Sequence, residues 1–170
     1  MTRRGWIATA GCVVLFVGAS ALSSPVPKVI WNASASVPIG LYAVKAPDAL
    51  HIGELVVVRP PEAVAAFLAQ RGYLARGVPL LKHVLALPGQ TVCRTGRAIT
   101  VDGTILGDAL DCDRLGRVLP DWQGCRIVAD SEVFLMNWQS TNSFDGRYFG
   151  PLSASTIVGR AVPLWTEKDD

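Results

Sequence analysis

Hydrophobic positions follow two different patterns along this chain. Residues 5–27 form one uncharged and nearly continuous apolar run. Beyond it, apolar or alternating runs of four to eight residues are separated by Gly, Pro, Asp or Asn, which is typical of short strands. The expected strands cover residues 41–44, 54–58, 80–87, 99–101, 104–106, 132–136 and 157–162, with a further one around Val92.

One segment has a helical period instead. Pro61 precedes residues 62–71, where apolar side chains recur at helical spacing, and Gly72 follows them. A tight hairpin is expected at Asp102-Gly103, because this dipeptide tolerates the positive φ angles that such a turn requires. The pattern therefore predicts a mainly β domain of antiparallel strands with one short helix.

The apolar run at residues 5–27 is long enough for a membrane anchor, because about 20 helical residues cross the roughly 30 Å hydrocarbon core of a bilayer. Two arginines precede it and favour a cytoplasmic start. We expect residues 1–27 to form a cytoplasmic start and an N-terminal transmembrane helix, and residues 28–170 one domain across the membrane. A cleaved signal peptide is the alternative, because residues 19–21 match a small-x-small cleavage pattern.

Composition narrows the class of protein. Half of the 170 residues are hydrophobic and the mean hydropathy is +0.33, which excludes a disordered chain. The 16 basic and 14 acidic residues leave a net charge of only +2, without a basic stripe. Nucleic acid is therefore not an expected partner.

The cysteines fit an exported domain, in which disulfides persist. Cys112 and Cys125 bracket a polar loop with Pro and Gly, so a bridge between them would staple that loop. Pairing of either one with Cys93 is also open. No metal is expected, because Cys-x-x-Cys is absent and His51 and His83 are the only histidines.

A lysine in an apolar strand is the first candidate for chemistry. Strand alternation places Lys82 on one face with Leu80 and Val84. Burial on such a face lowers the pKa of an amine, and a neutral amine can act as a general base near pH 7. The ordinary alternative is a lysine at a strand edge that reaches water or pairs with a carboxylate.

A candidate nucleophile lies just after the apolar run. Pro38 and Gly40 favour a rigid turn that would present Ser36 with its own backbone N–H directed into the site. The Ser34 hydroxyl could donate to the same oxyanion. A plain linker is the alternative for this Ser/Ala/Pro/Gly cluster.

The polar segment at residues 137–150 follows an expected buried strand. Asp145 and Arg147 are close enough in sequence to form an ion pair that fixes the loop. The alternative is an ordinary polar turn without a role in chemistry.

These three clusters, in this order, resemble the type I signal peptidase family of membrane-anchored serine proteases with a Ser/Lys dyad. The matching segments are residues 34–38, 82–89, 142–150 and, at the end of the domain, 158–161.

The resemblance implies two antiparallel sheets with a site on the outer membrane face. It implies Ser36 as the nucleophile, Lys82 as the general base and Ser143 as the residue that orients the lysine. Ser34 would assist the Ser36 N–H in holding the oxyanion. The ion pair of Asp145 and Arg147 would support the site.

Departures from the family pattern indicate a particular branch. Val37 stands where the housekeeping enzymes usually have Met, Gly146 where they have Ser, and His83 where they have Arg. The sequence of residues 36–42 and the helix at residues 62–71 resemble the conjugative-transfer branch, in which Asp145 would act more directly in catalysis.

Peptidases of this branch mature a pilin precursor in plasmid mating systems, and some join the new pilin ends into a ring. This implies a periplasmic domain on the bacterial inner membrane, an exported precursor as partner and no cofactor. Hydrolysis and ring closure both remain open.

Two other functions are considered. A self-cleaving Ser/Lys repressor shares this fold but would carry a DNA-binding domain where the apolar run stands. A membrane-anchored assembly factor of a conjugation or secretion channel would use the β domain for binding alone.

Overall fold

The computed structural model describes residues 5–6, 10–14, 28–47 and 49–167. Residues 5–6 and 10–14 are helical. Most of the expected membrane anchor lies outside the described residues. Within the described ranges, no helix is both long and apolar enough to cross a membrane.

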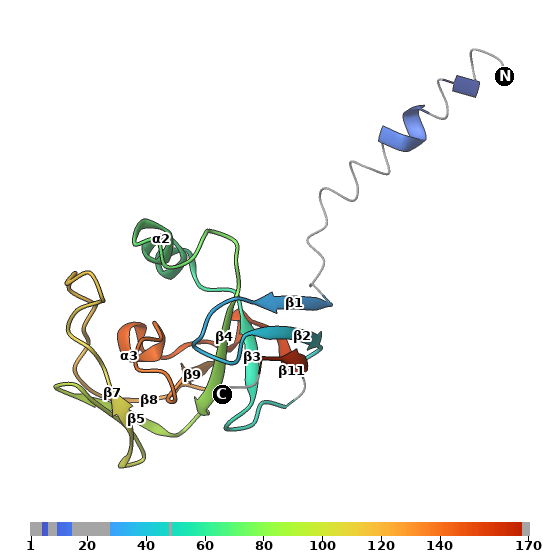
Figure 1. The fold of residues 1–170 in the computed structure, drawn as a ribbon. Coiled ribbons are helices and arrows are strands. Elements are labelled where there is room, and N and C mark those ends of the chain that lie inside the picture. The colour runs from blue at the N-terminus through green and yellow to red at the C-terminus, as the bar shows by residue number, and fades with distance from the viewer. Residues whose placement is uncertain (1–4, 7–9, 15–27, 48, 168–170) are drawn as a thin grey trace.

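The larger sheet contains seven strands in the order β1-β2-β11-β3-β4-β9-β10, and all of its strand pairs are antiparallel. Its strands lie side by side at the right of the ribbon in Figure 1. The expected strands are found with small changes at their ends. Their bounds are β1 (Val29–Asn32), β2 (Gly40–Lys45), β3 (Leu55–Val58), β4 (Leu80–Ala86), β9 (Glu132–Met136), β10 (Leu152–Ser153) and β11 (Ile157–Thr166).

The smaller sheet contains four antiparallel strands in the order β7-β6-β5-β8. Its β6–β7 hairpin turns at Asp102 and Gly103, with φ angles of +48° and +81°, as the sequence predicts. The strands are β5 (Thr91–Thr95), β6 (Ala98–Val101), β7 (Thr104–Asp108) and β8 (Gly124–Ile127).

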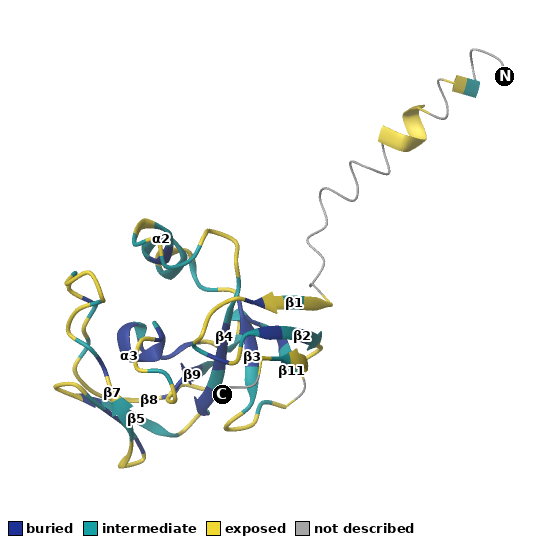
Figure 2. Cartoon of the chain, in the orientation of Figure 1, coloured by how far each residue is buried: buried dark blue, intermediate teal, exposed yellow. Residues whose placement is uncertain are grey.

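Each face of the larger sheet contributes to a separate part of the core. Val56 and Val84 belong to a hydrophobic cluster on one face, and Val57 and Leu81 to a cluster on the other. A third cluster joins the two sheets, because Phe134 of β9 and Ile99 of β6 both belong to it. The middle of the larger sheet is consequently the most buried part of the molecule (Figure 2).

Among residues 28–47 and 49–167, two α-helices lie outside the sheets. The expected helix is α2 (Glu62–Gln70), and the unexpected helix α3 (Gly146–Phe149) is a single turn between the two sheets (Figure 1). A 3-10 turn, η1 (Ala154–Thr156), leads into β11. The fold is thus mainly β with few helices.

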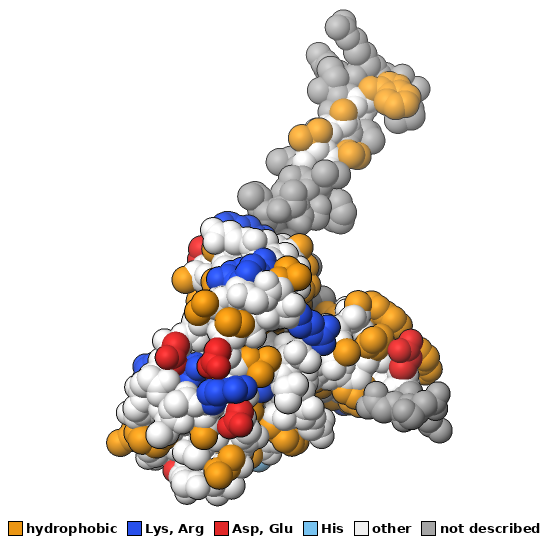
Figure 3. All heavy atoms as spheres, turned by 60° about the vertical axis from the view of Figure 1, so that its left-hand side comes forward, with side chains coloured by type: hydrophobic (Ala, Val, Ile, Leu, Met, Phe, Trp, Pro, Cys, Tyr) orange, Lys and Arg blue, Asp and Glu red, His pale blue; other side chains and the backbone are white. Residues whose placement is uncertain are grey.

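The loop before β8 binds the segment that follows α2. Asp113 accepts a hydrogen bond from the Tyr73 hydroxyl and pairs with Arg117 at 2.7 Å and with Arg71 at 3.9 Å. Figure 3 shows such basic and acidic side chains close together on this face of the molecule. These contacts tie the helical insertion to the domain.

The predicted Cys112–Cys125 disulfide is wrong. Cys125 of β8 is bonded to Cys93 of β5, while Cys112 is an exposed free thiol. The reason is register: Cys93 and Cys125 lie directly opposite each other in the β5–β8 pair, with their Cα atoms 4.0 Å apart. Residues 124–127 were not among the expected strands, so the sequence did not indicate that Cys93 and Cys125 lie opposite each other.

Candidate active site

Lys82 is buried in the middle of β4, with only 3% of its surface exposed. Leu80 and Val84 belong to one core cluster, as expected from strand alternation. The Lys82 ammonium donates a hydrogen bond to Ser143 Oγ at 2.7 Å. Sequence and structure therefore agree on an amine in an apolar environment with one hydroxyl partner.

The environment lowers the pKa of Lys82 from its ordinary value of 10.5 to about 8. Burial is the largest cause, because it removes water from the ammonium. Arg147 lowers this pKa further by repulsion, and Asp145 opposes both effects by attraction. A useful fraction of the amine is consequently neutral near pH 8.

The predicted ion pair of Asp145 and Arg147 is confirmed. Both residues are almost completely buried, and two parallel contacts join them, Nε to Oδ1 at 2.8 Å and Nη2 to Oδ2 at 2.9 Å. The same Arg147 Nη2 donates to the carbonyls of Ser140 at 2.7 Å and Ser143 at 3.1 Å. The pair therefore fixes the loop that carries the hydroxyl partner of Lys82.

Asn137, which the sequence analysis did not single out, fixes the backbone on both sides of the lysine. Its side-chain nitrogen donates to the Leu81 carbonyl at 3.0 Å, and its side-chain oxygen accepts from the His83 N–H at 3.2 Å. The His83 ring contacts the same oxygen, and burial lowers the pKa of that imidazole. A polar residue directly after a buried strand was the available sequence signal.

Gly146 has a steric reason to be glycine. A Cβ atom at this position would lie 2.6 Å from the Phe134 ring and 2.7 Å from the Leu135 carbonyl oxygen of β9. The serine usual at this position in the family would therefore require a shift of α3 away from β9. The ion-paired loop therefore packs directly against β9 at this glycine.

Ser36 lies in a turn between β1 and β2. Its hydroxyl is 2.8 Å from the Ser34 hydroxyl, and its backbone N–H donates to the same Ser34 oxygen at 3.3 Å. The two groups predicted to hold an oxyanion are thus bonded to each other in this structure. A substrate carbonyl would have to replace that contact.

Asn32, at the end of β1, shapes this turn and was missed by the sequence analysis. Its side-chain nitrogen donates to the carbonyls of Ser34, Val37 and Pro38, at 2.8, 3.1 and 3.0 Å. The Tyr42 hydroxyl adds a 2.6 Å hydrogen bond to the Pro38 carbonyl. The segment is consequently a fixed turn rather than a linker.

The two halves of the predicted dyad are carried by neighbouring parts of the fold. Val37, next to Ser36, and Leu81, next to Lys82, belong to the same hydrophobic cluster. No hydrogen bond joins Ser36 to Lys82 among the residues that the structure describes, since the two side chains bond to Ser34 and Ser143 instead. The structure thus shows the dyad residues in separate hydrogen-bonded pairs.

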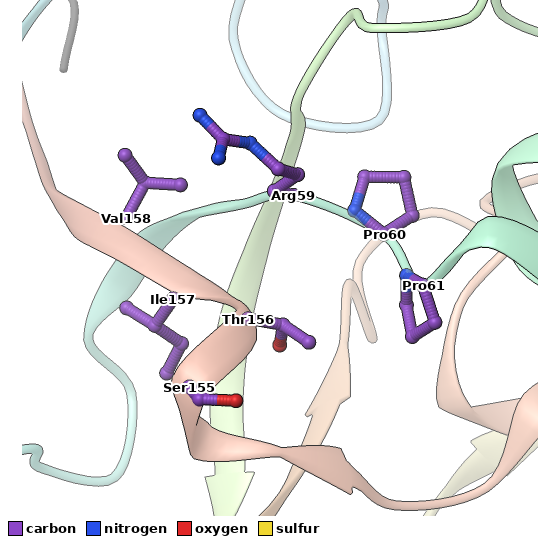
Figure 4. A pocket seen from close by; sticks show the side chains of 7 residues that line it. All are labelled: Arg59, Pro60, Pro61, Ser155, Thr156, Ile157 and Val158. Carbon is purple, nitrogen blue, oxygen red and sulfur yellow. The ribbon is translucent and has the colours of Figure 1, made fainter. Parts of the chain in front are cut away.

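A shallow hollow lies between the end of β3 and the start of β11, lined by Arg59, Pro60, Pro61 and residues 155–158 (Figure 4). It contains none of the predicted site residues. The described part of the chain also holds no group of three metal-ligating side chains. The hollow and the predicted site are thus formed by different residues.

The known proteins similar to this chain include plasmid or conjugal transfer proteins and signal peptidases. A plasmid transfer protein TraF of Escherichia coli is 35% identical over 166 residues, covering 92% of this chain and 91% of the relative. A conjugal transfer protein TraF of Agrobacterium fabrum is 33% identical and covers 98% of both chains. Among solved structures, a signal peptidase I of Enterococcus faecalis aligns with a TM-score of 0.39 and 16% identity, over 69% of this chain and 98% of that one.

The family model described as signal peptidase, peptidase S26, matches residues 2–165. This match spans the expected nucleophile turn, the lysine strand and the ion-paired loop together. The resemblance inferred from those segments is confirmed, and the chain belongs to the signal peptidase family, peptidase S26.

Proposed function

We propose that this protein is a membrane-anchored serine endopeptidase of a conjugation system. It would process an exported precursor, a conjugative pilin, on the periplasmic face of the bacterial inner membrane. Ser36 is the nucleophile and Lys82 the general base. Asp145, Arg147 and Ser143 hold the base in place.

The burial of Lys82 carries this proposal. A lysine with an ordinary pKa would be protonated at neutral pH and could not accept a proton. Here the pKa is about 8, and Ser143 directs the amine. Lowering of an amine pKa by burial is the usual way in which a protein makes lysine a base.

The proposed reaction has two steps. The neutral Lys82 amine takes the Ser36 proton as the Ser36 oxygen bonds to the substrate carbonyl carbon. The peptide C–N bond then breaks, and the new amine leaves with the proton from Lys82, so that an ester on Ser36 remains. Ser36 and Lys82 must approach each other for this step, and such contacts often tighten only after substrate binds.

The turn around Ser36 supplies the oxyanion donors. In the free protein the Ser36 N–H donates to Ser34 Oγ at 3.3 Å. When the substrate carbonyl enters, both the N–H and the Ser34 hydroxyl turn to the developing negative charge. The turn is held by Asn32, so these donors need little reorganisation.

The second step decides the product. Water attacking the ester on Ser36 gives hydrolysis, whereas the α-amine of a peptide gives a new peptide bond and a ring or a joined chain. In both cases the ester C–O bond breaks, and Lys82 takes a proton from the attacking group and passes it to the departing Ser36 oxygen. The names of the relatives, plasmid transfer and conjugal transfer proteins, support a role in a mating system, and a pilin precursor of that system is the proposed substrate. A membrane-bound precursor would meet an anchored enzyme at high effective concentration.

The test uses the full chain purified in detergent, incubated with the pilin precursor of the same plasmid. Mass spectrometry follows the precursor, because a linear product and a ring differ by one water. Ser36→Ala is compared with Ser155→Ala, a matched substitution in a second Ser-Ala-Ser turn. We expect Ser36→Ala to abolish processing and Ser155→Ala to retain the rate of the wild-type protein.

Two results would contradict the proposal. Cleavage by folded Ser36→Ala at the wild-type rate would exclude this serine as the nucleophile. Failure of the folded wild-type protein to change the precursor mass would favour a non-enzymatic assembly factor.

A further inference from the structure

A buried arginine of the smaller sheet reaches the ion-paired loop. Arg94 lies on β5 beside the disulfide at Cys93, and only 3% of its surface is exposed. Its Nη1 donates to the backbone carbonyl of Arg147 at 2.7 Å. Neither the nucleophile turn nor β4 contains this residue, so its role is not that of a reacting group.

Each nitrogen of the Arg94 guanidinium has a polar partner. Nε donates to the Gly96 carbonyl at 3.2 Å, Nη1 also lies 3.4 Å from the Pro120 carbonyl, and Nη2 pairs with Asp121 at 3.1 Å. A planar guanidinium with fixed donors has one orientation. It therefore acts as a rigid strut between β5 and α3.

The contact falls where α3 needs a partner. A helix of one turn leaves its last carbonyls without intrahelical donors. Arg94 donates to the carbonyl of Arg147. The Trp122 indole N–H donates at 3.1 Å to the carbonyl of Gly146, which also accepts from the Gly150 N–H. Two residues from the smaller sheet and the loop before β8 thus set the position of α3.

From α3 the connection continues to the lysine. Arg147 Nη2 donates to the Ser143 carbonyl at 3.1 Å, and Ser143 Oγ accepts from Lys82 at 2.7 Å. Each of these residues is buried. An unbroken series of hydrogen bonds and residues therefore leads from Arg94 to the amine.

We propose that Arg94 is a positioning residue for Lys82: through Arg147 and Ser143 it fixes where the amine lies and keeps water away from it. This inference rests on the proposed function for its catalytic meaning. Its structural part, the effect on the lysine, can be measured without any substrate.

The titratable and charged groups around Lys82 are Asp145, Arg147 and the neighbouring His83. Burial is the largest influence on the amine, and water entering a loosened loop would reduce it. Loss of the strut should therefore raise the pKa of Lys82. A rise of about 1 would cut the neutral amine about tenfold near pH 7.

The experiment compares four variants of the full chain in detergent. Arg94→Met removes the strut, and Arg94→Lys keeps a donor for the Arg147 carbonyl. Trp122→Phe removes only the second donor to α3, and Arg97→Met is the matched control. Arg97 lies in the β5–β6 turn, is half exposed and contacts Ala109 and Asp111 instead of α3.

Three measurements separate positioning from simple stability. The pKa of Lys82 is read from the 13Cε resonance of labelled lysine and assigned with Lys82→Met. The pH profile of kcat/KM is recorded with the precursor, and thermal unfolding shows that each variant is folded. Reading the lysine directly keeps a failure of this inference distinct from a failure of the proposed function.

We expect folded Arg94→Met to raise the pKa of Lys82, to move the acidic limb of the profile upward and to lower kcat about tenfold at pH 7. Arg94→Lys should recover part of this loss, and Arg97→Met should match the wild-type protein. If Arg94→Met does not fold, Trp122→Phe should show a smaller shift in the same direction. An unchanged Lys82 pKa in folded Arg94→Met, or in Trp122→Phe when the former is unfolded, would overturn the inference.

Discussion

Two Ser-Ala-Ser turns in this molecule have the same local hydrogen bonds. In one, the hydroxyls of Ser34 and Ser36 are 2.8 Å apart and the Ser36 N–H donates to Ser34 Oγ at 3.3 Å. In the other, Ser153 and Ser155 have the same two contacts at the same distances. Local geometry alone therefore does not distinguish a nucleophile from an ordinary surface serine.

The surroundings of the two turns differ. The first is fixed by buried Asn32 and borders the cluster that includes Leu81, next to the buried amine. The second begins the exposed turn η1 and lines the hollow near Arg59, in which no lining residue carries an amine or a carboxylate. The reactivity of a serine in this fold should depend on the side chains around its turn. The contribution of each of them can be tested separately.

The largest effect is expected from removing the base. Lys82→Met should make Ser36 as inert as Ser155 and lower kcat/KM by about 10³-fold or more. Stability should be kept or increased, because an apolar side chain of similar volume replaces a buried ionisable group. Precursor cleavage and thermal unfolding measure the two effects, with Lys45→Met on the exposed end of β2 as the control. Full activity in Lys82→Met would make the two turns chemically equivalent.

The next largest effect is expected from pH. Because the pKa of Lys82 is about 8, kcat/KM should fall about tenfold per pH unit below that value and level off above it. The pKa in the unfolded chain is higher, so the unfolded state binds the extra proton between about pH 8 and 10.5.

Stability should consequently rise with pH across that window, whereas below pH 8 both states are protonated and the lysine gives no slope. Urea unfolding at several pH values, compared with Lys82→Met, isolates this contribution. A kcat/KM that does not change from pH 6 to pH 9 would contradict the proposal that Lys82 is a buried base.

A smaller effect is expected from releasing the first turn. Asn32→Ala removes the side-chain donor to three carbonyls, of which, among the described residues, only that of Pro38 keeps a second donor, the Tyr42 hydroxyl, and it should cost about 1–3 kcal/mol in the free energy of unfolding. In the second turn, Thr156→Val removes a hydrogen bond to the Ser153 carbonyl at an exposed site and should change stability by less than about 0.5 kcal/mol. Urea unfolding compares them, and equal losses would show that both turns are held equally.

The smallest effect is expected at the auxiliary hydroxyl. Ser34→Ala removes one proposed oxyanion donor but leaves the Ser36 N–H, so kcat should fall about tenfold with little change in KM. Ser153→Ala removes the corresponding hydroxyl of the second turn and should affect only stability. Steady-state kinetics on both variants would decide this, and an unchanged kcat in Ser34→Ala would remove this residue from the oxyanion site.

The strands of the core were predictable because their apolar patterns are local. Val29–Asn32 and Gly124–Ile127 were missed for a physical reason. The first has only four residues and is separated from the apolar run by Lys28 alone. All four residues of the second are exposed, so no alternation marks it. The disulfide could not be assigned without the second strand, because the pairing of Cys93 with Cys125 depends on register.

In the candidate site, too, some features were predictable from local sequence and others were not. The alternation around Lys82 indicated a buried amine, with a lysine at a strand edge as the alternative, and the spacing of Asp145 and Arg147 allowed their ion pair. The hydrogen bonds of Asn32, Asn137 and Arg94 were not predictable, because their acceptors lie on other elements. One signal was available: strand alternation places Arg94 on the inward face with Val92, where an unpartnered charge would be costly.

The disulfide of the smaller sheet also affects the order of assembly. β8 buries none of its side chains, so backbone pairing, the bond from Cys125 to Cys93 and a partly exposed ion pair of Arg126 with Glu132 keep it at the edge of β5. Wherever the two thiols stay reduced, that edge is weakly covered and open to pairing with another chain. Oxidation of the two thiols would thus hold β8 against β5 and protect the domain from self-association.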